Sequence, residues 1–101
     1  MLTQCVALDH GPQGVRANCV CPGWIQTPMA DAAMERLGPS REEAYARVHR
    51  TNPLRRPGAP EEVAGAVAWL LSPEAAYVNG ALLCVDGGVG ILDAASAEFV
   101  A

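Results

Sequence analysis

The chain has 101 residues, with seven basic residues (all arginine), eleven acidic residues and a net charge of −4, and half of it is hydrophobic. This aliphatic content excludes a disordered chain and suffices for one small core, hence for one domain or less. The longest apolar stretch, Val63–Leu71, is far shorter than the roughly 20 residues that a helix needs to cross a bilayer. The arginines form no basic stripe of the kind that binds nucleic acid, and no secretory leader is apparent. We therefore expect a cytoplasmic protein that binds neither membranes nor nucleic acid.

The first predicted elements are a helix and a strand. Met1–His10 carries apolar residues at helical intervals and predicts a helix. Gly11–Gly14 ends this helix, because glycine permits the left-handed backbone of a helix exit. Val15–Cys21 is a short β-favouring run that is closed by Pro22-Gly23, and it predicts a strand that ends at this turn.

Two further helices are expected after the turn. Asp31–Leu37 predicts a short helix that ends at Gly38-Pro39. Ser40 and Glu43 have the spacing of a capping box, which favours a second helix through about Arg50. Its apolar content is thin, so we expect it to lie on the surface, and we interpret residues 30–50 as helices that form a lid over a substrate.

The clearest helix begins at Pro60, which suits the first helical position. Two glutamates follow it where a helix N-terminus favours negative charge, although Ala59 is a poor residue for the cap position. Ser72-Pro73 ends this helix. Ala81–Val85 then predicts a second strand, and the next residues predict a turn.

The turn after this strand superficially resembles a phosphate-binding loop. Val85–Gly90 is glycine-rich and precedes the helix-prone segment Ile91–Phe99. However, Asp93 stands where a third glycine belongs and would repel a phosphate. We therefore predict a tight terminal turn here.

The order helix, strand, helices, strand predicts an α/β fold with two parallel strands joined by a crossover. Parallel strands are normally covered on both faces and flanked by other strands. Two strands alone leave unpaired edges and half-covered faces. We therefore interpret residues 1–101 as a single partial domain that is incomplete as a free-standing unit.

The four cysteines do not have the spacing of a metal or redox motif. Cys19 and Cys21 lie two apart, whereas zinc knuckles and redox pairs place two residues between the thiols. Cys5 and Cys84 are solitary in the sequence. We interpret all four as structural thiols and expect neither a metal site nor a disulfide.

Three stretches of the chain resemble the classical short-chain dehydrogenase/reductase family. Val15–Thr27 resembles a late strand of that family and the loop after it. Asn52–Gly58 and Pro60–Ala64 resemble the next loop and helix, and Tyr77–Gly88 resembles the last strand and its closing turn. The stretches occur in the order and spacing of the family and cover nearly the whole chain.

The resemblance implies the C-terminal part of a Rossmann-type, doubly wound parallel sheet. It also implies NAD or NADP as the cofactor of the complete protein and hydride transfer between a small-molecule carbonyl and an alcohol. The catalytic serine and the Tyr-x-x-x-Lys pair of the family are not found in this sequence, and Tyr45 and Tyr77 lack a lysine four residues on. We therefore assign no catalytic residue, expect the isolated chain to be inactive, and do not expect it to hold the cofactor alone.

The resemblance assigns the nicotinamide end of the cofactor site to four residues. It implies that Pro22 and Gly23 turn the backbone past the ring, that Ile25 offers backbone groups to the carboxamide, and that Thr27 offers a hydroxyl. An amide has a donor and an acceptor, which such groups can satisfy. For Thr27, a turn-stabilising hydroxyl before Pro28 is the alternative.

Substrate contacts in this family follow the same loop. The residues that we expect to line the substrate are Trp24, Met29, Met34 and Leu37. Ordinary core or interface packing is the alternative for each of them. A different function is also open for the whole chain, namely a non-catalytic interaction module that docks on a full-length or split relative or builds a homo-oligomer.

Overall fold

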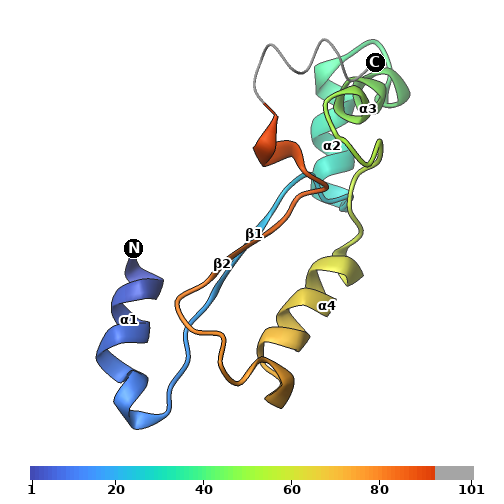
Figure 1. Ribbon diagram of the computed structural model, residues 1–101. Helices are drawn as coiled ribbons and strands as arrows, with labels where there is room; N and C mark the ends of the chain where they lie inside the picture. The colour runs from blue at the N-terminus through green and yellow to red at the C-terminus, as the bar shows by residue number, and fades with distance from the viewer. Residues whose placement is uncertain (93–101) are drawn as a thin grey trace.

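The computed structural model describes residues 1–92 of the chain (Figure 1). Most of the helix-prone segment Ile91–Phe99 therefore lies outside the described residues. The described residues contain four α-helices and two strands, with short 3₁₀ turns between them. The helices are α1 (Leu2–His10), α2 (Pro28–Leu37), α3 (Arg41–Arg50) and α4 (Pro60–Leu70), and the strands are β1 (Cys19–Pro22) and β2 (Leu82–Val85).

The two strands form a parallel sheet, as predicted. The register pairs Cys19 with Leu82 at one end and Pro22 with Val85 at the other. Strand β1 begins at Cys19, later than the expected Val15. Before Cys19, the side chain of Asn18 makes the hydrogen bonds that backbone groups would make between paired strands. The Asn18 amide accepts from the Ala81 N–H at 2.9 Å and donates to the Val78 carbonyl at 3.0 Å.

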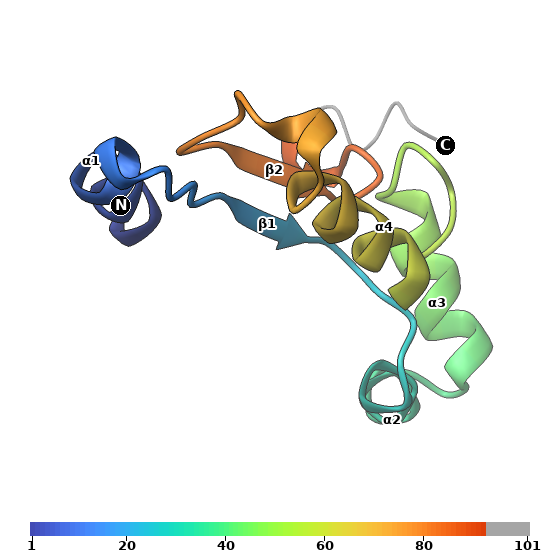
Figure 2. The ribbon, with the colours of Figure 1, turned by 90° about the horizontal axis from the view of Figure 1, so that it is seen from below.

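Helix α4 lies along one face of this sheet (Figure 2). Val20 of β1 lines a cavity of about 270 Å³ together with Val67 and Leu70 of α4. Arg16 fastens the end of the helix, since its guanidinium donates to the Leu70 carbonyl at 2.7 Å and to the Val78 carbonyl at 3.0 Å. Charged groups on the last carbonyls of a helix satisfy acceptors that have no partner within it.

The hydrophobic core formed by residues 1–92 is small. The buried hydrophobic residues are Ala7, Met34, Ala44, Leu70 and Ala75. The radius of gyration is 16.8 Å, compared with about 13 Å for a compact domain of 100 residues. Figure 1 shows the reason: α1 lies at one end of the strands, and α2 and α3 lie at the other. The α/β unit is therefore open and partial. No helix among residues 1–92 has the length and hydropathy to span a bilayer.

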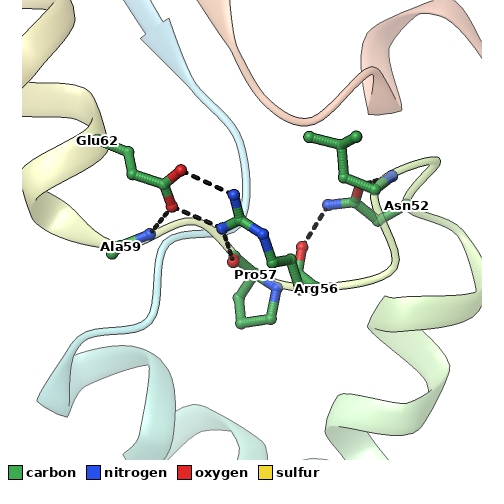
Figure 3. A network of polar contacts seen from close by, with 6 residues as sticks. Asn52, Arg56, Pro57, Ala59 and Glu62 are labelled. Atoms are coloured by element: carbon green, nitrogen blue, oxygen red, sulfur yellow. Dashed lines mark hydrogen bonds and ion pairs between the residues drawn. The ribbon is translucent and has the colours of Figure 1, made fainter.

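Glu62 compensates for the poor cap residue at the start of α4. Its carboxylate accepts from the Ala59 N–H at 2.9 Å and pairs with the Arg56 guanidinium at 2.6 and 2.8 Å (Figure 3). The Arg56 guanidinium, aided by the Ala59 N–H, lowers the pKa of Glu62 to about 2. The carboxylate is thus held in its charged form.

Acid is expected to loosen the start of α4 through this carboxylate. Because the folded pKa of Glu62 lies below its ordinary value of 4.5, its stabilising contribution is present at neutral pH and is lost as the pH falls from about 4.5 towards 2. Glu62→Gln should remove much of this acid dependence of helical circular dichroism. Glu61→Gln in the same turn is the matched control and should leave it unchanged, whereas equal effects of the two variants would contradict the assignment.

Candidate functional site

The candidate site follows the end of β1, where the backbone turns at Gly23. The Gly23 N–H donates to the Val85 carbonyl at 3.0 Å and so ties the turn to β2. A Cβ at Gly23 would lie only 2.7 Å from the Cα of Asp86. The turn therefore requires glycine because two backbones approach closely, which agrees with the predicted role of Pro22-Gly23 as a turn.

Ile25 lies in an isolated parallel pairing with Gly58. The Gly58 N–H donates to the Trp24 carbonyl, and the Gln26 N–H donates to the Gly58 carbonyl, each at 2.8 Å. In an extended strand, successive backbone groups point to opposite edges, so the N–H and C=O of Ile25 point away from Gly58. No hydrogen bond among residues 1–92 engages either group. A free donor and a free acceptor thus lie together at Ile25.

Thr27 is the N-cap of α2. Its hydroxyl oxygen accepts from the Ala30 N–H at 3.1 Å, and Pro28 occupies the first helical position. The helix therefore starts at Pro28, earlier than the expected Asp31, because cap and proline fix its first turn. The Thr27 hydroxyl oxygen thus acts as a helix cap, a role that the sequence analysis did not weigh. A hydroxyl also carries a donor, which the cap does not use.

A cavity of about 350 Å³ opens beside this loop. Trp24 and Ile25 line it on one side, the 52–58 loop on another, and the turn after β2 on a third. Among the predicted loop residues, Ile25 and Trp24 reach this cavity, whereas Pro22, Gly23 and Thr27 do not line it. The cavity lies at the carboxyl ends of the parallel strands, where open α/β sheets bind their ligands.

Asn52 supports one wall of this cavity, a role that the sequence did not predict. It is 2% exposed, accepts from the Leu54 N–H and donates to the Arg56 carbonyl, both at 2.8 Å (Figure 3). Its amide also packs against Gly87, where a Cβ would come within 2.5 Å of it. The only local signal was the Asn-Pro pair, which favours a turn but does not predict a contact with the turn after β2.

The proposed lining residues differ in position. Trp24 is 40% exposed and lines the cavity, whereas Met29 and Leu37 are 82% and 59% exposed on α2. Met34 is 1% exposed and belongs to the buried residues of the α2–α3 pair. For Met34, the structure therefore shows the packing role that the sequence left open.

Polar contacts join the two helices of residues 30–50. The Tyr45 hydroxyl donates to the Asp31 carboxylate, and Arg41 lies 3.9 Å from Asp31 and 3.7 Å from Glu35. Desolvation, together with the Asp31 carboxylate, raises the pKa of Tyr45 to about 12. This phenol therefore keeps its proton and serves as a link between α2 and α3.

Asp86 occupies the turn that superficially resembled a phosphate-binding loop. Its carboxylate accepts from the Gly88 N–H at 2.9 Å and from the Gly90 N–H at 3.0 Å. The Asp86 carboxylate therefore already occupies the backbone donors that a phosphate would need, and its negative charge would repel a phosphate. Gly87 and Gly88 form the tight turn that the sequence predicted, and a 3₁₀ turn at Val89–Ile91 follows it. Among residues 1–92, no group of three acidic, histidine or cysteine side chains is arranged to hold a metal ion.

Comparison with known proteins gives consistent matches. A family model described as enoyl-(acyl carrier protein) reductase matches residues 1–90. Protein MoaE of Klebsiella aerogenes is 54% identical over 102 residues, which cover 97% of this chain and 40% of that protein.

Two solved structures have the same fold over this region. A short chain dehydrogenase family protein from Francisella tularensis superposes with a TM-score of 0.85 at 32% identity, over 90% of this chain and 39% of that one. The aldohexose dehydrogenase of Thermoplasma acidophilum superposes with a TM-score of 0.82 at 41% identity, over 92% of this chain and 38% of that one. The chain thus spans about 40% of the length of these relatives.

Proposed function

The chain belongs to the short-chain dehydrogenase/reductase family, and on this premise we propose that it supplies the nicotinamide end of an NAD or NADP site. The complete protein would then be an oxidoreductase that moves a hydride between a small-molecule carbonyl and an alcohol. The observation that carries this proposal is the free backbone donor and acceptor at Ile25, which lie just beyond the carboxyl end of β1 on the side away from Gly58.

The chemistry of a carboxamide fits these groups. Its NH₂ can donate to the Ile25 carbonyl, and its oxygen can accept from the Ile25 N–H and from the hydroxyl proton that Thr27 does not use as a cap. The Pro22-Gly23 turn brings this loop close to the end of β2. When bound, the nicotinamide supplies or accepts the hydride, and the role of this chain is to hold and orient its amide.

The helices after the loop are proposed to cover the substrate. Thr27 caps α2, so the position of this helix is coupled directly to the cofactor loop. Met29 and Leu37 present exposed apolar side chains, while Met34 braces α2 from within. We propose a cytoplasmic protein, and the four free cysteines agree with a reducing compartment.

The second candidate function is a module that docks on another chain of the family or on a second copy. The observation that favours it is the exposed apolar surface: Leu2 and Leu8 of α1, Leu71 after α4, and Leu82 of β2 all lie open. A docking module need not contribute to a cofactor site. The two candidates therefore differ in whether this chain can replace the corresponding part of an active relative.

A chimera tests the proposal. The 101-residue chain would replace the matching segment of the Thermoplasma acidophilum aldohexose dehydrogenase, with NAD(P)-dependent aldohexose oxidation as the assay. We expect turnover by the chimera. Thr27→Asp retains the acceptor of the N-cap but has no donor, so it should raise the KM for the cofactor about tenfold at an unchanged melting temperature.

Thr27→Ser is the matched control, since it retains both the acceptor and the donor. It should leave the KM for the cofactor within about twofold of the unsubstituted chimera. A folded chimera without turnover would overturn the cofactor proposal and favour the docking module. An unchanged KM in Thr27→Asp would restrict Thr27 to its capping role.

A further inference from the structure

The fold brings together three of the four thiols. Cys19 and Cys21 lie on one face of β1, and Cys84 of β2 is the register partner of Cys21. Partners in a parallel ladder point to the same face, so Cys84 lies on that face as well. It is the face away from α4, because Val20 between the two β1 cysteines lines a cavity with α4. We name Cys19, Cys21 and Cys84 the thiol cluster; of the three, Cys84 also lines the cavity beside the cofactor loop.

The sulfurs of the thiol cluster interact. The Sγ atoms of Cys19 and Cys21 are 3.9 Å apart. The hydrogen bond with Cys19, followed by burial and the neighbouring charge of Cys19 and Cys84, raises the pKa of Cys21. Cys21 therefore holds its proton in the middle of the cluster. Cys84 is exposed to solvent, while Cys19 and Cys21 are half-buried.

Backbone geometry distinguishes between the two pairs that could form a disulfide. Residues two apart on a strand have Cα atoms about 6.6 Å apart, near the upper end of the range for disulfides, about 4.4–6.8 Å. Directly opposed residues on neighbouring strands have Cα atoms, and therefore Cβ atoms on the same face, about 4.8 Å apart. This pair comes nearer than the other to the Cβ separation of about 3.5–4.5 Å that a disulfide needs. The pair that suits a disulfide is therefore Cys21 with Cys84.

We propose that Cys21 and Cys84 are a site of reversible oxidation, where a hydroperoxide converts the two thiols into a disulfide between β1 and β2. The exposed Cys84 sulfur attacks the peroxide, whose O–O bond breaks; the sulfur is oxidised to a sulfenic acid and the peroxide is reduced to water or an alcohol. The Cys21 sulfur then attacks the Cys84 sulfur. The S–S bond forms, the S–O bond breaks, and the oxygen leaves as water with the proton of Cys21. A dithiol reductant reverses the change.

The test uses the 101-residue chain at low concentration with hydrogen peroxide as the probe, followed by alkylation and peptide mass mapping. We expect loss of two hydrogen atoms and a dominant Cys21–Cys84 linked peptide. Cys21→Ser and Cys84→Ser should each abolish it. Cys5→Ser is the matched control, because Cys5 is exposed on α1 outside the thiol cluster, and it should leave the product unchanged. Oxygen adducts without this linkage, or a dominant Cys19–Cys21 bond, would overturn the proposal.

A second measurement needs no variant and so does not depend on how a serine substitution folds. The same oxidation is repeated in concentrated urea, where the register of β1 with β2 is lost. Four cysteines allow six pairings, and the share of Cys21–Cys84 should fall severalfold towards that of the other pairs. An equal share with and without urea would show that the sheet does not select this pair, and would refute the proposal.

Discussion

The 101-residue chain by itself is expected to oxidise no NAD(P)H with any carbonyl substrate. General acid catalysis by a tyrosine at neutral pH needs a phenol whose pKa is lowered, as a nearby lysine does in the family that the chain resembles. The chain contains no lysine. The pKa of Tyr45 moves in the opposite direction, to about 12, and the Tyr77 side chain is fully exposed. The purified chain should therefore leave the absorbance of the reduced nicotinamide unchanged.

The chimera provides the positive control for this experiment, because it supplies the catalytic residues of the relative around the same 101 residues. Turnover that remains with the isolated chain through a second purification would contradict the prediction. Loss of that turnover in Tyr45→Phe would then assign it to this phenol. We expect no NAD(P)H oxidation by the isolated chain and measurable turnover by the chimera.

Gly87→Ala is expected to produce the largest loss of stability in the chain. Gly87 has φ of +65°, and a Cβ there would lie 2.5 Å from the side-chain oxygen of Asn52. Asn52 is fully enclosed and holds the 52–58 loop through two hydrogen bonds, so it has little room to move. The left-handed backbone and the overlap together should cost about 2–5 kcal/mol. The measurement is the thermal unfolding of the chimera.

Two other glycines separate the causes of this loss. Gly14 has φ of +79°, and a Cβ there would have no neighbour within 4 Å among residues 1–92, so Gly14→Ala should cost only the backbone strain of about 1–2 kcal/mol. Gly65 lies within α4 in open space, and Gly65→Ala should stabilise by about 0.5–1 kcal/mol. If Gly14→Ala and Gly87→Ala cost the same, contact with Asn52 is not what requires glycine at position 87.

Features that depend on a few neighbouring residues were predictable from the sequence. The Ser40 hydroxyl accepts from the Glu43 N–H, as the spacing of these residues indicated, and α3 ends at Arg50. Helix α4 begins at Pro60 as expected. The start of α2 was placed too late, because Thr27 was weighed as a turn residue or a cofactor ligand and not as a cap.

The candidate loop was predictable in part. Pro22, Gly23, Ile25 and Thr27 follow one another in the sequence, so their common loop needed no tertiary information. That the backbone groups of Ile25 are free depends on its pairing with Gly58, which comes from a distant segment. Asn52 beneath Gly87 and Cys84 opposite Cys21 are contacts of the same kind.

By itself, the sequence determined the helices, the two strands, the turns and the family to which the chain belongs. Caps act through hydrogen bonds that span about four residues, and prolines and turn glycines act through their own backbone angles, so a short stretch of sequence is enough to predict their effect. Only the tertiary structure decided the register of β1 against β2, the burial of Asn52 and Met34, and the clustering of three thiols. These depend on which distant segments meet, and a shift of one residue in the register would move every strand side chain to the other face of the sheet.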